Sequence, residues 1–178
     1  MGDTDAEGPA GPVLVLVGPP GAGKTTVGAL VAGRLGVAFR DTDDDVVALA
    51  GASVADIFVD HGEVAFRAWE ELAVVTAMRE HTGVLALGGG AVLSATTRGL
   101  LTGRRVAFLD VDAAEAARRV GLARDRPVLA LNPRARLRTL LAERRPLYEE
   151  VSALTVSTAG RDPDAVAEEL LRLTAVPP

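Results

Sequence analysis

The segment VLVLVGPPGAGKT, residues 13–25, carries more structural information than any other part of this 178-residue chain. It opens with an unbroken aliphatic run, residues 13–17, which is typical of a strand buried on both faces of a parallel sheet. The remainder, from Gly18 to Thr25, matches the pattern G-x-x-x-x-G-K-[ST] in full. Apolar residues then recur at helical spacing over residues 24–35 and stop at Gly36. A strand, a glycine-rich loop and a helix in this order predict a phosphate-binding P-loop.

The loop has the chemistry to hold the phosphates of a nucleotide. Its glycines let the backbone curl so that successive N–H groups face phosphate oxygens, and the helix start adds its positive end. Lys24, the only lysine of the chain, offers a compact ammonium to the β and γ phosphates, and the Thr25 hydroxyl suits Mg²⁺. We therefore expect ATP with one Mg²⁺ ion. The predicted ATP-binding residues of this segment are Gly21, Ala22, Gly23, Lys24, Thr25 and Thr26.

The composition is that of a globular protein of one domain. Hydrophobic residues make up 48% and charged residues 24%, which is enough for a packed core. The formal net charge of -5 provides no overall attraction for nucleic acid or an anionic membrane, so neither is an expected partner. The lack of cysteine excludes disulfides and thiol catalysis. Residues 1–12 are predicted to be a disordered acidic tail without a secretory signal, so a cytoplasmic enzyme is expected.

Short apolar runs alternate with helical periodicity along the rest of the chain. Further strands are predicted at 37–39, 83–87, 105–109 and 154–156, and further helices at 63–79, 113–120 and 163–173. This alternation predicts the α/β class, with helices on both faces of a central five-stranded parallel sheet in three layers. A single domain is expected over residues 13–176.

One segment, residues 121–136, does not fit this alternation. It is dense in arginine and interrupted by Pro127 and Pro133, which makes a core element unexpected there. We interpret it as a basic lid that closes over phosphates. A surface loop with solvated arginines is the alternative.

Two classes of P-loop protein lack their diagnostic residues in this chain. A GTPase reads guanine with a motif that contains a second lysine, and Lys24 is the only one present. Motor-type ATPases place an Asp-Glu pair after a second apolar strand, whereas Val111 follows Asp110 here. Neither a guanine-specific switch nor a motor is expected.

The acidic run of residues 41–45 follows the P-loop by one predicted helix and one predicted strand. For Asp44 and Asp45 we predict a helix N-cap role, in which the helix dipole favours acids. Asp41 and Asp43 are alternate residues on a segment that we expect to be extended, so both side chains would point the same way. One carboxylate could then face Mg²⁺ and the other a substrate hydroxyl.

Taken in order, the motifs resemble those of the shikimate kinase family, within the nucleoside monophosphate kinase-like P-loop enzymes. The resemblance covers residues 13–173 and rests on the P-loop, Asp41-Thr42-Asp43, Phe66-Arg67-Ala68-Trp69-Glu70, Leu87-Gly88-Gly89-Gly90-Ala91-Val92, Arg126-Pro127 and Arg144-Arg145-Pro146-Leu147-Tyr148. Many functions share a P-loop, but its combination with the other motifs at this spacing is specific. The resemblance implies a P-loop NTP hydrolase-like fold with a lid and a helical substrate-binding region.

The resemblance also implies an activity. A member of this family transfers the γ-phosphoryl group of ATP to the 3-hydroxyl of shikimate, giving ADP and shikimate 3-phosphate, in the pathway to chorismate and the aromatic amino acids. It implies that Asp43 positions the hydroxyl and accepts its proton, that Gly89 lies against the ring, and that Arg67 and Arg144 bind the carboxylate. An arginine fork suits a planar carboxylate. The resemblance also suggests a monomer.

Plainer explanations of the same residues stay open. Arg67 on a predicted helix could be a surface charge paired with Glu63 or Glu71, although Glu70, three residues on, could orient it. Three successive glycines could form an ordinary flexible turn, although they follow a predicted strand at the edge where α/β sheets bind ligands.

On the nucleotide side, the resemblance implies that Arg126 reaches the phosphates from the lid, where with Lys24 it would offset charge in the transition state. It implies that Thr25 and Asp41 serve the metal and that Arg161 lies beside the adenine ring. An arginine at a helix start also has simpler explanations. Three other functions remain as alternatives: a gluconate kinase-like small-molecule kinase, a non-catalytic P-loop regulator, and a kinase-like scaffold protein, which would not need both the acids and the arginines.

Overall fold

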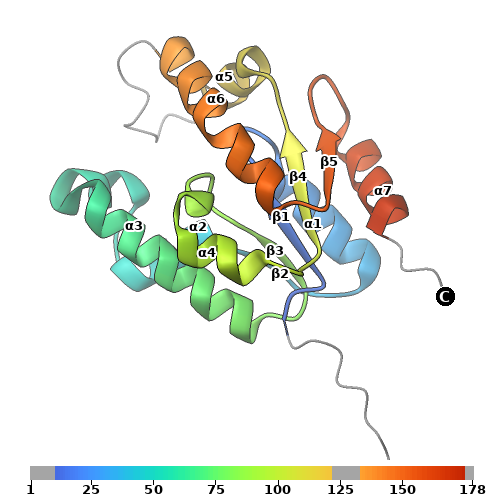
Figure 1. The fold of residues 1–178 in the computed structure, drawn as a ribbon, viewed down its shortest axis with the longest axis horizontal. Helices are drawn as coiled ribbons and strands as arrows, with labels where there is room; N and C mark the ends of the chain where they lie inside the picture. The colour runs from blue at the N-terminus through green and yellow to red at the C-terminus, as the bar shows by residue number, and fades with distance from the viewer. Residues whose placement is uncertain (1–10, 122–132, 175–178) are drawn as a thin grey trace, which may run out of the picture.

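The chain folds around one parallel sheet of five strands, shown in Figure 1. The structure is a computed structural model that describes residues 11–121 and 133–174. The strands are β1 (Leu14–Val17), β2 (Phe39–Asp41), β3 (Val84–Ala86), β4 (Val106–Asp110) and β5 (Leu154–Ser157). Their order in the sheet is β2-β3-β1-β4-β5, and each neighbouring pair is parallel. The predicted α/β fold class is confirmed.

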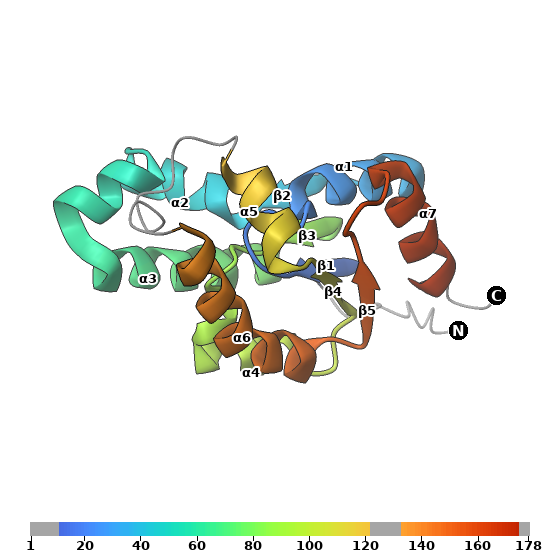
Figure 2. The same cartoon turned by 90° about the horizontal axis from the view of Figure 1, so that it is seen from above.

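Helices cover both faces of the sheet. They are α1 (Lys24–Leu35), α2 (Thr42–Ala50), α3 (Val54–Glu80), α4 (Ala95–Leu101), α5 (Ala113–Gly121), α6 (Pro133–Val151) and α7 (Pro163–Thr174), with a short 3₁₀ helix η1 (Ala91–Leu93). Helices α1 and α7 lie on one face, and α3, α4 and α6 lie on the other (Figure 2). Among the described residues, no helix has both the length and the apolar composition needed to cross a membrane.

The central strand β1 contributes to both hydrophobic cores. Leu14 and Leu16 pack in the core beneath α1 and α7, whereas Val15 and Val17 pack in the core beneath α3 and α6. All four side chains are at most 2% exposed. Because successive side chains of a strand point to opposite faces, a strand covered on both sides needs an unbroken apolar run.

Two element boundaries differ from the sequence prediction. Strand β2 begins at Phe39 and not at residue 37, because the Val37 N–H donates to the carbonyl of Ala32 at 3.0 Å and so closes α1. Helix α3 begins at Val54 instead of residue 63. Its first part was not predicted, because Gly62, with φ 78° and ψ 175°, interrupts the helical backbone and with it the apolar pattern.

Both ends of the predicted lid, residues 121–136, belong to helices. Residue 121 ends α5, and residues 133–136 form the start of α6, so the expectation that the whole stretch lies outside regular elements is wrong there. Pro133 suits the first position of a helix, and the buried Leu137 anchors the first turns of α6. Residues 122–132, with Arg126, lie outside the described residues, as do residues 1–10 of the predicted tail.

Candidate active site

The loop between β1 and α1 has the backbone of a phosphate-binding loop. Gly21 and Gly23 have φ values of 81° and 87°, in the left-handed region that glycine adopts without strain. Gly23 is the N-cap of α1, so the N–H groups of the first helical turn face the loop. The Lys24 ammonium donates to the carbonyls of Gly18 at 2.8 Å and Pro19 at 3.1 Å. Its charge therefore lies against the loop, where anions bind at a helix start.

The two residues predicted for the metal lie side by side. The Thr25 hydroxyl donates to Asp41 Oδ2 at 2.7 Å, across 16 residues of sequence. Mg²⁺ binds oxygen ligands and usually takes only one or two from the protein, the rest coming from phosphates and water. A hydroxyl and a carboxylate next to the P-loop lysine fit that mode. Within the described ranges there is no cluster of three or more His, Cys, Asp or Glu side chains that could hold a metal alone.

The acidic run is arranged differently from the prediction. Asp41 ends β2 and is itself the N-cap of α2, because its Oδ1 accepts from the N–H of Asp43 at 3.0 Å. Asp43 therefore belongs to the first helical turn, and the predicted extended segment through both residues is wrong. Asp44 and Asp45 follow within the same turn, where the helix dipole favours acids as predicted, but they do not cap the helix. The reason is that the strand is only three residues long, so the helix begins one residue after Asp41.

The triple glycine after β3 is the point where the other predicted residues meet. A Cβ at Gly88 would lie 2.6 Å from Asp43 Oδ1 and 2.7 Å from Glu70 Oε1. A Cβ at Gly89 would lie 2.8 Å from Cδ of Pro20 in the P-loop. A Cβ at Gly90 would overlap the guanidinium of Arg67. The absence of side chains in this triplet thus lets acids, P-loop and arginine approach one backbone segment.

Arg67 is held by acids of its own helix. Its Nη1 donates to Glu70 Oε2 at 2.6 Å and its Nη2 lies 3.3 Å from Glu63 Oε1. Glu70 is only 3% exposed, and burial raises the pKa of its carboxyl, although the Arg67 guanidinium opposes that shift. The contact expected between Arg67 and Glu70 is present. Glu71, the other acid that the sequence offered, accepts instead from the Ser94 hydroxyl.

The second predicted arginine reaches the same glycines from helix α6. Arg144 Nη1 donates to the Gly89 carbonyl at 3.1 Å. The hydroxyl of Tyr148, one helical turn later, donates to the same oxygen at 2.6 Å. Arg144 also contributes to the electrostatic environment of Glu70, as do Arg67 and Asp43. The residues predicted to contact substrate therefore form one group around Gly88–Gly90.

A cavity of about 460 Å³ lies on the α4 side of Arg67, within the size range of small-molecule sites. Its lining residues are Glu63, Val64, Arg67, Glu70, Glu71, Gly90, Ala91, Leu93, Ser94 and Thr97. Asp43 and Arg144 are not among them. Two buried polar atoms of this lining, Arg67 Nε and Thr97 Oγ1, have no hydrogen-bond partner among the described residues.

Comparisons with known proteins identify the family. A family model described as shikimate kinase matches residues 20–175. A shikimate kinase from Frankia casuarinae is 58% identical over 96% of this chain and 78% of its own length, and one from Streptomyces avermitilis is 58% identical over 90% and 94%. The chain belongs to the shikimate kinase family. A solved shikimate kinase from Acinetobacter baumannii, in complex with shikimate, superimposes with a TM-score of 0.88 at 37% identity and covers 93% of each chain.

Arg161, which was predicted for the nucleotide, does not join the group at the glycines. Arg161 lies after β5, where its Nη1 donates to the carbonyl of Ser157 at 2.9 Å and its Nη2 pairs with Glu169 at 2.6 Å. These contacts support a structural role at the start of α7 and leave the adenine role a prediction. Arg126 lies outside the described residues.

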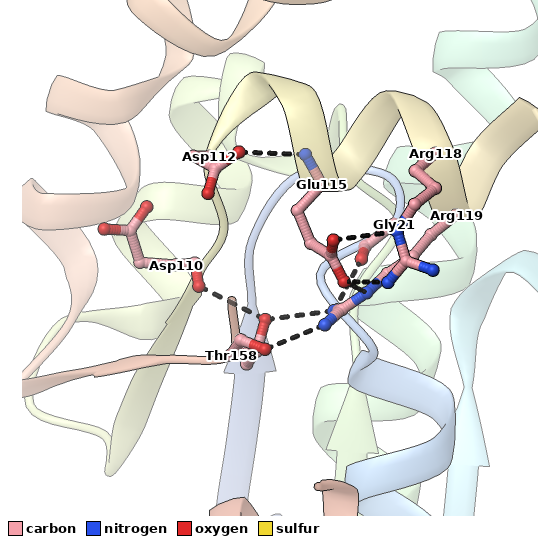
Figure 3. A network of polar contacts seen from close by, with 7 residues as sticks. All are labelled: Gly21, Asp110, Asp112, Glu115, Arg118, Arg119 and Thr158. Atoms are coloured by element: carbon pink, nitrogen blue, oxygen red, sulfur yellow. Dashed lines mark hydrogen bonds and ion pairs between the residues drawn. The ribbon is translucent and has the colours of Figure 1, made fainter. Parts of the chain in front are cut away.

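Sequence reasoning missed a polar network that ties α5 to the P-loop of this shikimate kinase family member (Figure 3). Glu115 accepts from Nε of Arg118 at 3.0 Å and from Nε of Arg119 at 2.9 Å. Arg119 also donates to the carbonyls of Gly21 at 3.1 Å and Thr158 at 2.8 Å. The spacing of Glu115 and the two arginines was a visible signal. It indicated only a pair within the helix, because the contact with Gly21 spans 98 residues.

Proposed function

We propose that this chain transfers the γ-phosphoryl group of ATP to the 3-hydroxyl of shikimate, giving ADP and shikimate 3-phosphate for the synthesis of chorismate and aromatic amino acids. The observation that carries the proposal is the convergence of Asp43, Arg67 and Arg144 on the triple glycine beside the P-loop. This combination of an acid and guanidinium forks suits a hydroxylated carboxylic acid. Membership of the shikimate kinase family supports the same substrate.

The nucleotide would bind along the P-loop. The N–H groups from Gly21 to Thr26 would face the phosphates, and Lys24 would exchange its contacts with the loop carbonyls for phosphate oxygens. Thr25 and Asp41 would hold the one Mg²⁺ ion, which when bound neutralises charge on the β and γ phosphates. Their hydrogen bond places both oxygens next to the lysine that serves the same phosphates.

The substrate would lie over Gly89, with its carboxylate on Arg67 and Arg144. Arg67 is already oriented by Glu70, and Arg144 by the Gly89 carbonyl, so neither side chain needs a large rearrangement to bind. Such preorganisation lowers the entropy cost of binding. Asp43 would then accept the proton of the 3-hydroxyl.

The transfer step follows from these positions. The substrate oxygen forms a bond to the γ-phosphorus while the bond from that phosphorus to the β–γ bridging oxygen breaks. The hydroxyl proton passes to the Asp43 carboxylate, and ADP leaves with the bridging oxygen. Lys24 and Arg126 would offset the charge of the phosphoryl group in transit, Arg126 from the lid. Arg161 would border the adenine.

A coupled assay of ADP release with Mg·ATP tests the proposal directly. We expect faster turnover with shikimate than with gluconate at equal concentrations, because gluconate is the substrate of the alternative kinase. Faster turnover of gluconate would overturn the choice of substrate. No ADP release with saturating shikimate would favour a non-catalytic regulator.

We further propose that the enzyme acts as a monomer in the cytoplasm. Each of the grouped side chains comes from one chain, so the site does not require a second copy. Size-exclusion chromatography with light scattering should give a mass near 18.4 kDa. A stable mass of twice that value would contradict the monomer.

A further inference from the structure

The carbonyls of the triple glycine are held in different ways. Gly88 and Gly90 bond within the local turn, because their oxygens accept from the N–H groups of Ala91 and Leu93, each at 3.0 Å. The Gly89 oxygen accepts instead from the side chains of Arg144 and Tyr148 on helix α6, more than fifty residues away. Glycine has the largest backbone freedom of any residue, so this central peptide depends on α6 for its orientation.

The surroundings of Tyr148 favour its hydrogen bond to the Gly89 carbonyl. Tyr148 is 1% exposed, and its ring stacks on Phe108 of β4 with ring centroids 5.1 Å apart and planes 25° apart. A buried hydroxyl is costly unless it is hydrogen-bonded, and the Gly89 carbonyl at 2.6 Å meets that need. Burial raises the pKa of the phenol to about 12, so the hydroxyl keeps its proton and stays a donor at neutral pH.

Arg144 depends on the same oxygen. Residues four apart on a helix lie on one face, so Arg144 and Tyr148 approach Gly89 together. Arg144 uses Nη1 for the carbonyl, and its guanidinium also interacts with the Tyr148 phenol. A guanidinium has five N–H donors, so others can serve an anion. If the oxygen moved, the anchor that directs the guanidinium would move with it.

We propose that Tyr148 is a positioning residue for the substrate carboxylate. Its hydroxyl fixes the Gly89 carbonyl and, through that carbonyl, the direction of Arg144. The inference rests on the proposed function, since it concerns the same substrate. Tyr148 would thus act in binding although its side chain is buried and does not need to touch the substrate itself. The phenol acts through geometry that is already set before the substrate arrives.

The test is Tyr148→Phe, which removes one oxygen and keeps the stacked ring. We expect KM for shikimate to rise about tenfold, while kcat and KM for ATP change by no more than about twofold. Shikimate methyl ester, which lacks the carboxylate charge, should show nearly the same KM with the variant as with the wild type. An unchanged KM for shikimate, or an equal rise for acid and ester, would overturn the inference.

A control variant separates positioning from packing. Phe108→Leu disturbs the ring on which Tyr148 stacks but leaves the hydroxyl, so we expect lower stability to urea with KM for shikimate nearly unchanged. If both variants raise KM equally, Tyr148 acts through packing alone and the inference is wrong. If the wild-type enzyme does not turn over shikimate, the proposed function fails instead, and these outcomes are distinguishable.

Discussion

Asp43 and Glu70 flank Gly88 within a few ångströms, and their surroundings suit them to different tasks. Glu70 is buried and its carboxylate meets Nη1 of Arg67, so its oxygens serve to orient that guanidinium. Asp43 is half-buried in the first turn of α2, two residues after the Asp41 that bonds to Thr25. An acid in that position lies between the predicted metal residues and the glycines, which suits proton transfer at the reacting hydroxyl.

Replacing Asp43 with asparagine should separate binding from chemistry. We expect Asp43→Asn to lower kcat by about 10²–10⁴-fold, because the proton acceptor is lost, with little change in affinity for ATP. Steady-state kinetics and a nucleotide-binding titration measure the two quantities. Asp44→Asn is the matched control, since Asp44 is the exposed neighbour on the same turn and should keep full activity. Normal turnover in Asp43→Asn would remove Asp43 from the mechanism.

Glu70 should leave a signature in the pH dependence of stability. Burial raises the pKa of its carboxyl above the ordinary 4.5, against the opposing effect of Arg67. The native state then holds this proton more tightly than the unfolded state, so its contribution to stability is greatest at low pH and decreases as pH rises from 4.5 through the raised value. We expect the free energy of unfolding in urea, wild type minus Glu70→Gln, to decrease over that interval. An increase would show that the Arg67 ion pair outweighs burial.

At the level of elements, helix α1 joins the P-loop to the sheet through a close contact with β2. Gly28 faces Phe39 and Leu16, and a Cβ there would overlap the Phe39 ring. Gly33 lies in the same helix on the exposed side, and a Cβ there would meet nothing within 4 Å. The two glycines therefore have different structural roles. Gly28 allows close packing against the strand that ends at Asp41, whereas Gly33 is under no such constraint.

Alanine at these two positions should have opposite effects on stability. We expect Gly28→Ala to destabilise the protein by about 1–3 kcal/mol, because the new methyl group overpacks the contact with β2. Gly33→Ala should stabilise it by about 0.5–1 kcal/mol, because alanine loses less backbone entropy in a helix. Urea unfolding measures both. Destabilisation by both variants to the same degree would contradict the packing argument.

At the level of the whole molecule, the nucleotide site exists only when the sheet is assembled. Thr25 follows β1, and Asp41 ends the edge strand β2, with β3 lying between these two strands in the sheet. Their contact at 2.7 Å is therefore absent from an unfolded chain. A ligand that needs both residues must stabilise the native state as a whole.

Thermal unfolding should report this linkage. At a hundredfold excess over its Kd, Mg·ATP should add about 2.7 kcal/mol to the free energy of unfolding, which corresponds to a rise in Tm of roughly 5–10 °C for a chain of this size. Chelation of the metal with EDTA should remove a large part of the rise in Tm, because Thr25 and Asp41 then have no metal ion to bind. In the variant Thr25→Val, the difference between the Tm with Mg·ATP and the Tm with ATP and EDTA should be smaller. Equal shifts with and without metal would contradict the assigned metal residues.

Local sequence was sufficient for the fold class and the P-loop, and it proposed the residues of the candidate site. The apolar runs, the helical spacing and the contiguous P-loop motif depend on neighbours in the chain, so they can be read without coordinates. The boundaries of β2 and α3 could not be predicted as well from the sequence. A hydrogen bond from Val37 and the interruption at Gly62 outweighed the apolar pattern at those points.

The relative placement of the groups depended on packing between distant elements. Arg144 and Tyr148 reach Gly89 across 55 and 59 residues, and Arg119 reaches Gly21 across 98. Such contacts follow from how α5 and α6 lie against the sheet, and no periodicity in the sequence encodes that arrangement. The helical setting of Asp43 has the same origin, because the length of β2 depends on its pairing with β3. Motifs therefore proposed the side chains of the candidate site, while helix and strand packing set which of their atoms meet.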